Sequence, residues 1–216
     1  GFAHDGHTCY ATTHGHPSPV HATGGQLQMT QKVRAALGPD AAIYTEETPC
    51  DITMQHQDGS FTYAITTTQD ELCPSHVNIT RFAVPDFKTI EILFCDQPLR
   101  DDIEDLGHIL FNGEAIWLEG IAEAWFDERS LDFIRRMHAI MSAEADCFTS
   151  LSPEPLVPTL WENLYANRFP RADGRRCLWT ISWKGPRTLR GDLLAVPHVA
   201  GARYRELWDG RALKVR

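Results

Sequence analysis

The sequence predicts an α/β protein whose residues 1–150 form the C-terminal part of a (β/α)8 TIM-like barrel and whose residues 151–216 form an antiparallel β-sandwich. Two observations favour the barrel. A helical pattern is followed at once by a short buried strand, and both apolar strand runs end in carboxylates, as barrel strands often do at their C-terminal ends. A third observation indicates the sandwich, because beyond residue 150 the chain changes to short alternating runs separated by Gly and Pro.

The first elements of the expected barrel are a helix and a strand. Residues 24–38 carry apolar side chains at close to helical spacing and end in a Gly-Pro pair. The run AAIYTEETP, residues 41–49, is typical of a buried strand that enters a loop. A second such strand is expected at residues 88–96, KTIEILFCD, with residues 51–87 as an excursion between the two.

The remaining elements are helices and then antiparallel strands. Residues 102–120 and 128–145 predict one or two helices. The second is the stronger, because five side chains fall on one face of it: Leu131, Ile134, Met137, His138 and Met141. The runs CLWTISW, TLRGDLLAVP and ARYRELWDG predict the strands of the second domain, which is short for a complete sandwich.

Charge and composition restrict the partners. The chain has 216 residues, 43% of them hydrophobic, and a net charge of -9. An acidic surface repels phosphate groups, so we expect neither a nucleic-acid nor a membrane partner, and no run of apolar residues is long enough to cross a bilayer. Six cysteines without a CxxC pair argue against a structural zinc ribbon. No cofactor is expected, and the cellular compartment stays open.

The main catalytic candidates are carboxylates at strand ends. Glu46 ends the first strand and shares a face with Tyr44, since side chains alternate along a strand. Asp96 ends the second strand, where it can serve as a general acid, a sugar ligand or a helix cap. Asp5 follows the end of a presumed preceding strand. Cleavage of a glycosidic bond needs two such carboxyl groups, and Glu46 alone supplies one of them.

A second group of candidates lies in FNGEAIWLEG, residues 111–120. Trp117 can stack on the apolar face of a sugar while Asn112 and Glu114 bind its hydroxyl groups. The alternative is an amphipathic helix in which Ile116, Trp117 and Leu118 belong to the core.

The histidines of TTHGHP permit three interpretations. An HxH pair at a strand end is a metal-binding pattern of barrel amidohydrolases, which makes a metal-dependent hydrolase built on His14 and His16 one alternative. Two features weigh against a metal: TTHGH follows no buried apolar run, and no later strand ends in His. Neutral imidazoles in a polar loop can instead bind substrate hydroxyls or orient carboxylates, or have a structural role.

Several segments together resemble one family. They are CYATTHGHP, YTEETP, RFAVPDFKTIEILF, FNGEAIWLEG, PLVPTLWENLYANRFP and LWTISW with RTLRGDLLAVPH. In this order they resemble the C-terminal half of large bacterial glycoside-hydrolase-like proteins with a (β/α)8 barrel and a following β-sandwich. The resemblance implies that HGHP follows barrel strand six, that Glu46 ends strand seven and that KTIEILF is strand eight. The earlier strands of such a barrel are absent, so Asp5 is the best visible partner carboxylate.

The predicted function is therefore a glycosidase, or part of one, that acts on a carbohydrate through two carboxyl groups. The alternatives are the metal-dependent hydrolase and a non-catalytic carbohydrate-binding or structural fragment. A part of a barrel would expose strand edges and apolar faces. We therefore expect an additional chain or a preceding segment to complete it.

Overall fold

The computed structural model describes residues 8–13, 15–16, 20–21, 23–46, 48–62, 77–94, 102–119, 126–197 and 199–214. The chain divides into two compact units. Unit 1 contains Gly1–Thr62 and Phe87–Ile90, and unit 2 contains Tyr63–Asp86 and Glu91–Arg216. None of the helices in the described part of the chain is long and apolar enough to cross a membrane.

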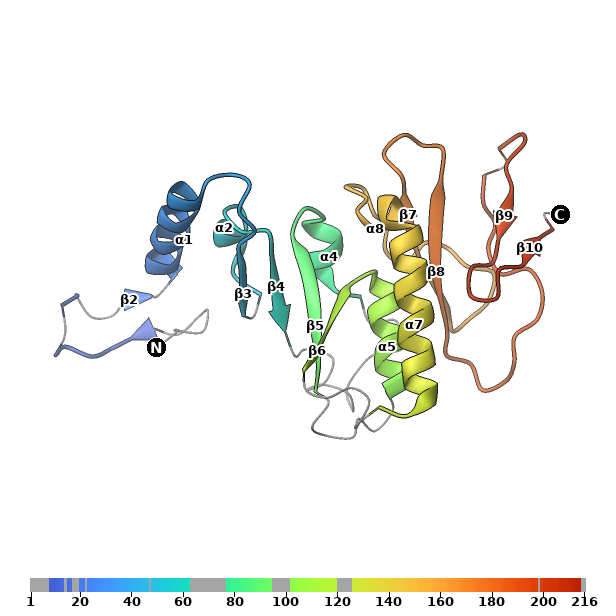
Figure 1. Ribbon diagram of the computed structural model, residues 1–216, viewed down its shortest axis with the longest axis horizontal. Coiled ribbons are helices and arrows are strands. Elements are labelled where there is room, and N and C mark those ends of the chain that lie inside the picture. The colour runs from blue at the N-terminus through green and yellow to red at the C-terminus, as the bar shows by residue number, and fades with distance from the viewer. Residues whose placement is uncertain are drawn as a thin grey trace. The chain divides into compact units, whose positions relative to one another are not determined.

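The part of unit 1 that the structure describes has two helices and four strands, apart from the first residues of β5 (Figure 1). They are β1 (Thr8–Cys9), β2 (Val20–His21), α1 (Thr23–Leu37), β3 (Tyr44–Glu46), α2 (Asp51–Met54) and β4 (Gly59–Thr62). The predicted helix is confirmed as α1. Its apolar stripe is not buried, however, because Met29, Val33 and Leu37 are exposed and Thr30 is the buried residue of this helix.

Arg34 joins the end of α1 to the following strands. Its guanidinium donates hydrogen bonds to the backbone oxygens of Ala41 (2.6 Å) and His56 (3.3 Å) and to Asp58 Oδ2 (2.6 Å). Asp58 Oδ2 also accepts from the backbone N–H of Ile43 (2.7 Å). The guanidinium of Arg34 thus positions the segments that lead into β3 and β4.

A four-stranded parallel sheet with the order β3-β4-β5-β6 gives the protein its α/β class. β5 comprises Lys88–Phe94 and β6 comprises Ala115–Glu119. The two predicted strands are found as β3 and β5. The sheet contains two further strands. β4 lies in the predicted excursion and overlaps its β-rich run FTYAITTT, whereas β6 lies where a helix was predicted.

The described residues of unit 2 form four helices and five strands, together with the remainder of β5. In addition to β6, the elements are α4 (Ile79–Ala83), α5 (Asp102–Asn112), α7 (Glu128–Ala143), α8 (Ala145–Phe148), β7 (Leu164–Pro170), β8 (Cys177–Trp183), β9 (Tyr204–Arg205) and β10 (Ala212–Leu213). The helix predicted from residue 128 is confirmed as α7, where Met137 is buried and His138 is exposed.

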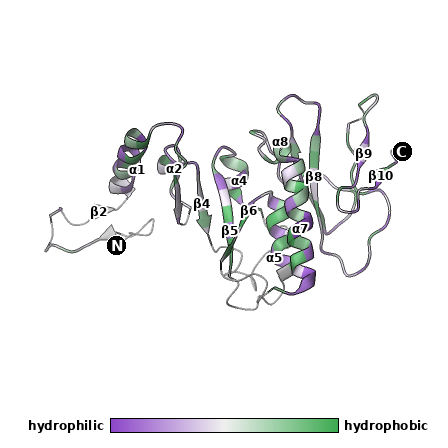
Figure 2. Ribbon diagram, viewed as in Figure 1, coloured by the Kyte–Doolittle hydropathy of each residue, from purple (hydrophilic) through white to green (hydrophobic). Residues whose placement is uncertain are grey.

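The core of unit 2 lies among β5, α5 and α7, with β7 and β8 against α5 and α8. Its first cluster is Leu93, Leu106, Ile109, Phe126 and Met137, and its second is Cys147, Phe148, Phe169 and Leu178. Figure 2 shows both hydrophobic and hydrophilic residues on α5 and on α7. The apolar residues that these helices give to the first cluster are Leu106, Ile109 and Met137.

The strands beyond residue 150 form two separate antiparallel pairs, β7 with β8 and β9 with β10. A sandwich is not shown by the described residues, and neither is a barrel. The run TLRGDLLAVP, predicted as a strand, has no regular secondary structure in residues 188–197. Side chains also bind across the predicted domain boundary at residue 150: Asn167 Nδ2 and Thr180 Oγ1 both donate to the backbone oxygen of Phe111, at 2.8 and 2.6 Å.

Candidate functional site

The end of β3 carries the first candidate site, in unit 1. Glu46 is the last residue of the strand and is exposed, and Tyr44 is 41% exposed, whereas Thr45 between them is half-buried. This is the alternation expected of a strand, and it puts Tyr44 and Glu46 on one face. Parallel pairing aligns Glu46 with Phe61 of β4.

A glycine makes room for the tyrosine of this site. Tyr44 pairs with Gly59, and a Cβ atom at Gly59 would lie 2.4 Å from Tyr44 Cε1 and 2.3 Å from the backbone oxygen of Lys88. No side chain fits at that distance, so only glycine allows the ring to lie over the neighbouring strand.

Hydrogen bonds between side chains hold β3 and the loop after it against β4. Thr45 Oγ1 donates to Gln57 Oε1 at 2.7 Å, and the hydroxyl oxygens of Thr48 and Ser60 lie 3.4 Å apart. Ser60 is fully buried. Glu46 therefore ends a strand that these contacts hold in place.

Asn112 and Glu114, predicted to bind substrate, lie inside unit 2. They are 0% and 1% exposed. Asn112 Oδ1 accepts from the backbone N–H of Asn78 (3.0 Å), and Asn78 Nδ2 donates to Glu114 Oε1. The structure brings the two residues together, but their burial removes them from direct contact with a ligand.

A buried arginine completes that network. Arg81 is 2% exposed and donates to the backbone oxygens of Gly113 (3.2 Å) and Phe148. Burial lowers the pKa of the Arg81 guanidinium, while the nearby charge of Glu114 acts in the opposite direction. Arg81 and Glu114 therefore have a structural role, because removing one partner of a buried charge pair is costly.

Trp117 has a different environment from its two predicted companions. It is 46% exposed on β6, between Ile116 and Leu118, which pack against the core. The predicted constellation of Asn112, Glu114 and Trp117 is thus divided between the interior and the surface. The alternative is wrong in its secondary structure, since Ala115–Glu119 is a strand, although Ile116 and Leu118 do pack against the core.

Most of the other predicted site residues lie outside the part of the chain that the structure describes. Asp5, His14 and Asp96 are outside the described residues, and His16 is half-buried in a bend. Among the described side chains, no group of three or more His, Cys, Asp or Glu residues is arranged to hold a metal ion. Burial raises the pKa of the Cys147 and Cys177 thiols, which disfavours their thiolate forms near neutral pH.

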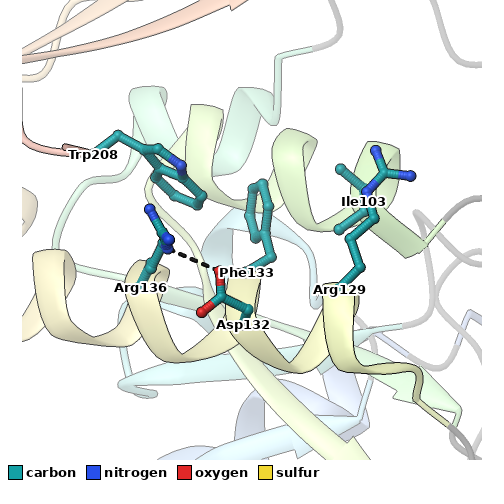
Figure 3. A pocket seen from close by; sticks show the side chains of 6 residues that line it. All are labelled: Ile103, Arg129, Asp132, Phe133, Arg136 and Trp208. Carbon is teal, nitrogen blue, oxygen red and sulfur yellow. Dashed lines mark hydrogen bonds and ion pairs between the residues drawn. The ribbon is translucent and has the colours of Figure 1, made fainter.

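A pocket that was not predicted lies in unit 2, where α7 meets the tip of the β9–β10 hairpin (Figure 3). Its volume is about 360 Å³, and it is lined by Ile103, Arg129, Asp132, Phe133, Arg136 and Trp208. The spacing of Asp132 and Arg136 by four residues, typical of a helical ion pair, is the one signal of it in the sequence. Nothing in the sequence indicates that a tryptophan from the C-terminal hairpin lies beside them.

The tip that carries Trp208 is fixed by its own hydrogen bonds. The carboxylate of Glu206 accepts from the backbone N–H groups of Trp208 and Asp209, and Gly210 takes a positive φ of 72°. Such a conformation favours glycine. The turn therefore fixes the backbone at Trp208.

Comparison with known proteins gives no relative: no family model, curated protein or solved structure matches the chain.

Proposed function

We propose that the chain is a glycoside hydrolase, or part of one, in which Glu46 is one of two catalytic carboxyl groups. The observation that carries the proposal is the position of Glu46 at the carboxyl end of a parallel strand, exposed and on the face of Tyr44. In α/β enzymes, reacting groups are commonly located at these strand ends, on loops that a rigid sheet supports.

The finer fold in this proposal is a section of a (β/α)8 barrel followed by a β-domain. Two features support it. The strand order β3-β4-β5-β6 follows the chain, as in a barrel wall, and the residues beyond 150 include an antiparallel strand pair. A complete barrel needs further strands, so we propose that another chain or another part of the protein supplies them.

In the proposed reaction one carboxylic acid protonates the leaving oxygen of the glycosidic bond. The other carboxylate either attacks the anomeric carbon or activates water on the opposite face. Asp5 is the proposed partner of Glu46. A separation of about 5 Å between the carboxyl groups would give retention of configuration, and one of roughly 6.5–9.5 Å would give inversion. Tyr44 is proposed to contact the sugar beside Glu46.

The test is the variant Glu46→Gln, which keeps the size of the side chain and removes its ionisation. A panel of aryl glycosides identifies an accepted substrate, and we expect the variant to lower kcat by about 10²–10⁴-fold, the usual contribution of such a group. Asp40→Asn is the matched control, since Asp40 is an exposed carboxylate in a turn of the same unit. Equal activity of the two variants, measured in protein that contains the completing strands, would contradict the proposal. So would a lack of hydrolysis by the unaltered protein in that same complete form.

A further inference from the structure

The pocket beside α7 is lined by one more guanidinium group than carboxylate groups, in a protein that is acidic overall. Two guanidinium groups and one carboxylate line it, although the chain carries a net charge of -9. Figure 3 shows Arg136 and Arg129 on either side of Phe133. Arginine binds planar carboxylates through two parallel hydrogen bonds, so an anionic ligand is favoured.

The two arginines differ in their surroundings. Arg136 Nε donates to Asp132 Oδ2 at 2.8 Å, and its Nη1 lies 3.7 Å from Asp209 Oδ1. Arg129 is exposed and attracts Asp127, whose side chain already accepts from the backbone N–H of Ser130. Arg136 is thus oriented by protein carboxylates, whereas Arg129 is exposed in the pocket that it lines.

Aromatic rings form the apolar part of the same pocket. The rings of Phe133 and Trp208 lie 4.7 Å apart at an angle of 52°, and the guanidinium of Arg136 lies 5.7 Å from the Trp208 ring. These contacts hold the indole against the helix. A rigid aromatic surface next to polar groups suits a ligand that has an apolar face and hydroxyl groups, as a sugar ring has.

The carboxylate of Asp132 further restricts the class of ligand that the pocket can bind. It repels a doubly charged phosphate more strongly than a singly charged carboxylate, and its oxygens can accept hydrogen bonds from hydroxyl groups. A volume of about 360 Å³ is near the lower limit for small-molecule sites, which suits a single ring rather than a long chain.

We propose that this pocket binds a hexuronic acid, with the sugar ring against Trp208 and Phe133 and its carboxylate on Arg129. This site is separate from Glu46 and does not depend on the proposed hydrolase activity.

Binding to the full chain tests the proposal. Titration of D-glucuronate and D-galacturonate, followed by saturation-transfer NMR, should give saturable binding of at least one of them. D-glucose, which has no charge, should bind at least about tenfold more weakly, which corresponds to one charge-assisted hydrogen bond pair. Raising the ionic strength should weaken the binding of the uronate, because the pocket is open to solvent.

Two variants on the same helix make the assignment specific. Arg129→Gln should weaken uronate binding about tenfold. Arg135→Gln should leave it unchanged, because Arg135 is an exposed arginine that pairs with Glu128 and does not line the pocket. Circular dichroism verifies that both variants are folded. Trp208→Leu should weaken the binding of the uronate and of glucose alike, since it removes the stacking surface.

Three results would overturn the inference: no saturable uronate binding by the unaltered protein, equal affinity for glucose, or equal effects of Arg129→Gln and Arg135→Gln. Glu46→Gln should not change uronate binding, so failure of the hydrolase proposal can be distinguished from failure of this one.

Discussion

At the scale of single residues, Asp58 in unit 1 combines charge, burial and backbone recognition. Burial opposes its ionisation, but hydrogen bonds from the Ile43 N–H and from Arg34, with the charge of Arg34, outweigh burial and lower the pKa of the Asp58 carboxyl. The side chain is 42% exposed, so solvent screens part of this interaction. The carboxylate therefore makes a modest contribution to the free energy of unfolding that depends on pH.

The direction of that dependence follows from the lowered pKa. A carboxyl group whose folded pKa is below its unfolded value stabilises the fold above the unfolded value, about pH 4. This stability is lost as the pH falls through the folded value. We expect Asp58→Asn to be less stable than the unaltered protein at neutral pH, and the difference to shrink in acid. Urea unfolding of both proteins at several pH values measures it, and a difference that grows in acid would contradict the assignment.

At the scale of secondary structure, two glycines of the α5 region differ in whether their positions can accept a side chain. Gly113 follows the helix with a φ of 68°, and a Cβ there would lie 2.9 Å from Phe148 Cδ1 and 3.1 Å from Phe169 Cζ. Gly107 lies inside α5, and a Cβ there would meet no atom within 4 Å. One glycine is needed to end the helix, and the other only weakens it.

The same substitution should therefore have opposite effects at the two positions. Gly113→Ala should destabilise the protein by about 1–3 kcal/mol, from a strained backbone and a steric conflict. Gly107→Ala should stabilise it by up to about 1 kcal/mol, because alanine has the higher helix propensity. Thermal unfolding of the pair measures both, and a shift of the same sign in both variants would show that the glycines are equivalent.

Gly113 also explains why the helix predicted to extend to residue 120 was wrong in its second half. The run AIWLE contains residues compatible with a helix or a strand, and short apolar runs do not distinguish the two. The Asn-Gly pair before this run is a turn signal, which indicates that the helix ends there. By contrast, α1 and α7 are long enough for their period to be diagnostic, and β5 is bounded by proline and an acid.

The candidate residues also show that sequence patterns predict local arrangements but not contacts between distant residues. Strand alternation was sufficient to predict that Tyr44 and Glu46 share a face, because both lie on one short strand. The burial of Asn112 and Glu114 depends on Asn78 and Arg81, which are more than thirty residues away in sequence. The pocket at Trp208 depends on contacts at still greater separation. Local patterns carry no information about such pairs.

At the scale of the whole molecule, the predicted domain boundary at residue 150 falls inside unit 2. Phe148 and Phe169, on either side of it, have ring centroids 5.5 Å apart, and Asn167 and Thr180 bind the oxygen of Phe111. The strands β7 and β8 therefore provide part of the core that covers α5 and α8.

A fragment of residues 1–150 tests whether the boundary separates independent domains. It lacks Leu164, Phe169 and Leu178, each of which contributes roughly 1.5–3 kcal/mol by burial. That loss is comparable to the total stability of a domain. We expect the amides of α5 to lose their protection from hydrogen exchange in the fragment. The amides of α1, which belongs to unit 1, should keep theirs and serve as an internal control. Protected α5 amides would support the boundary instead.

The two donors to the Phe111 oxygen also have a consequence for synthesis of the chain. Thr180 follows Phe111 by 69 residues. At about 5–20 residues per second, the ribosome makes this donor roughly 3–14 seconds after its acceptor. During that time Leu110 of α5 lacks Phe169 and Leu178, which belong to the cluster against which it packs. Unit 2 is thus completed late, from its C-terminal side, and this interval is when the nascent chain is most exposed to aggregation.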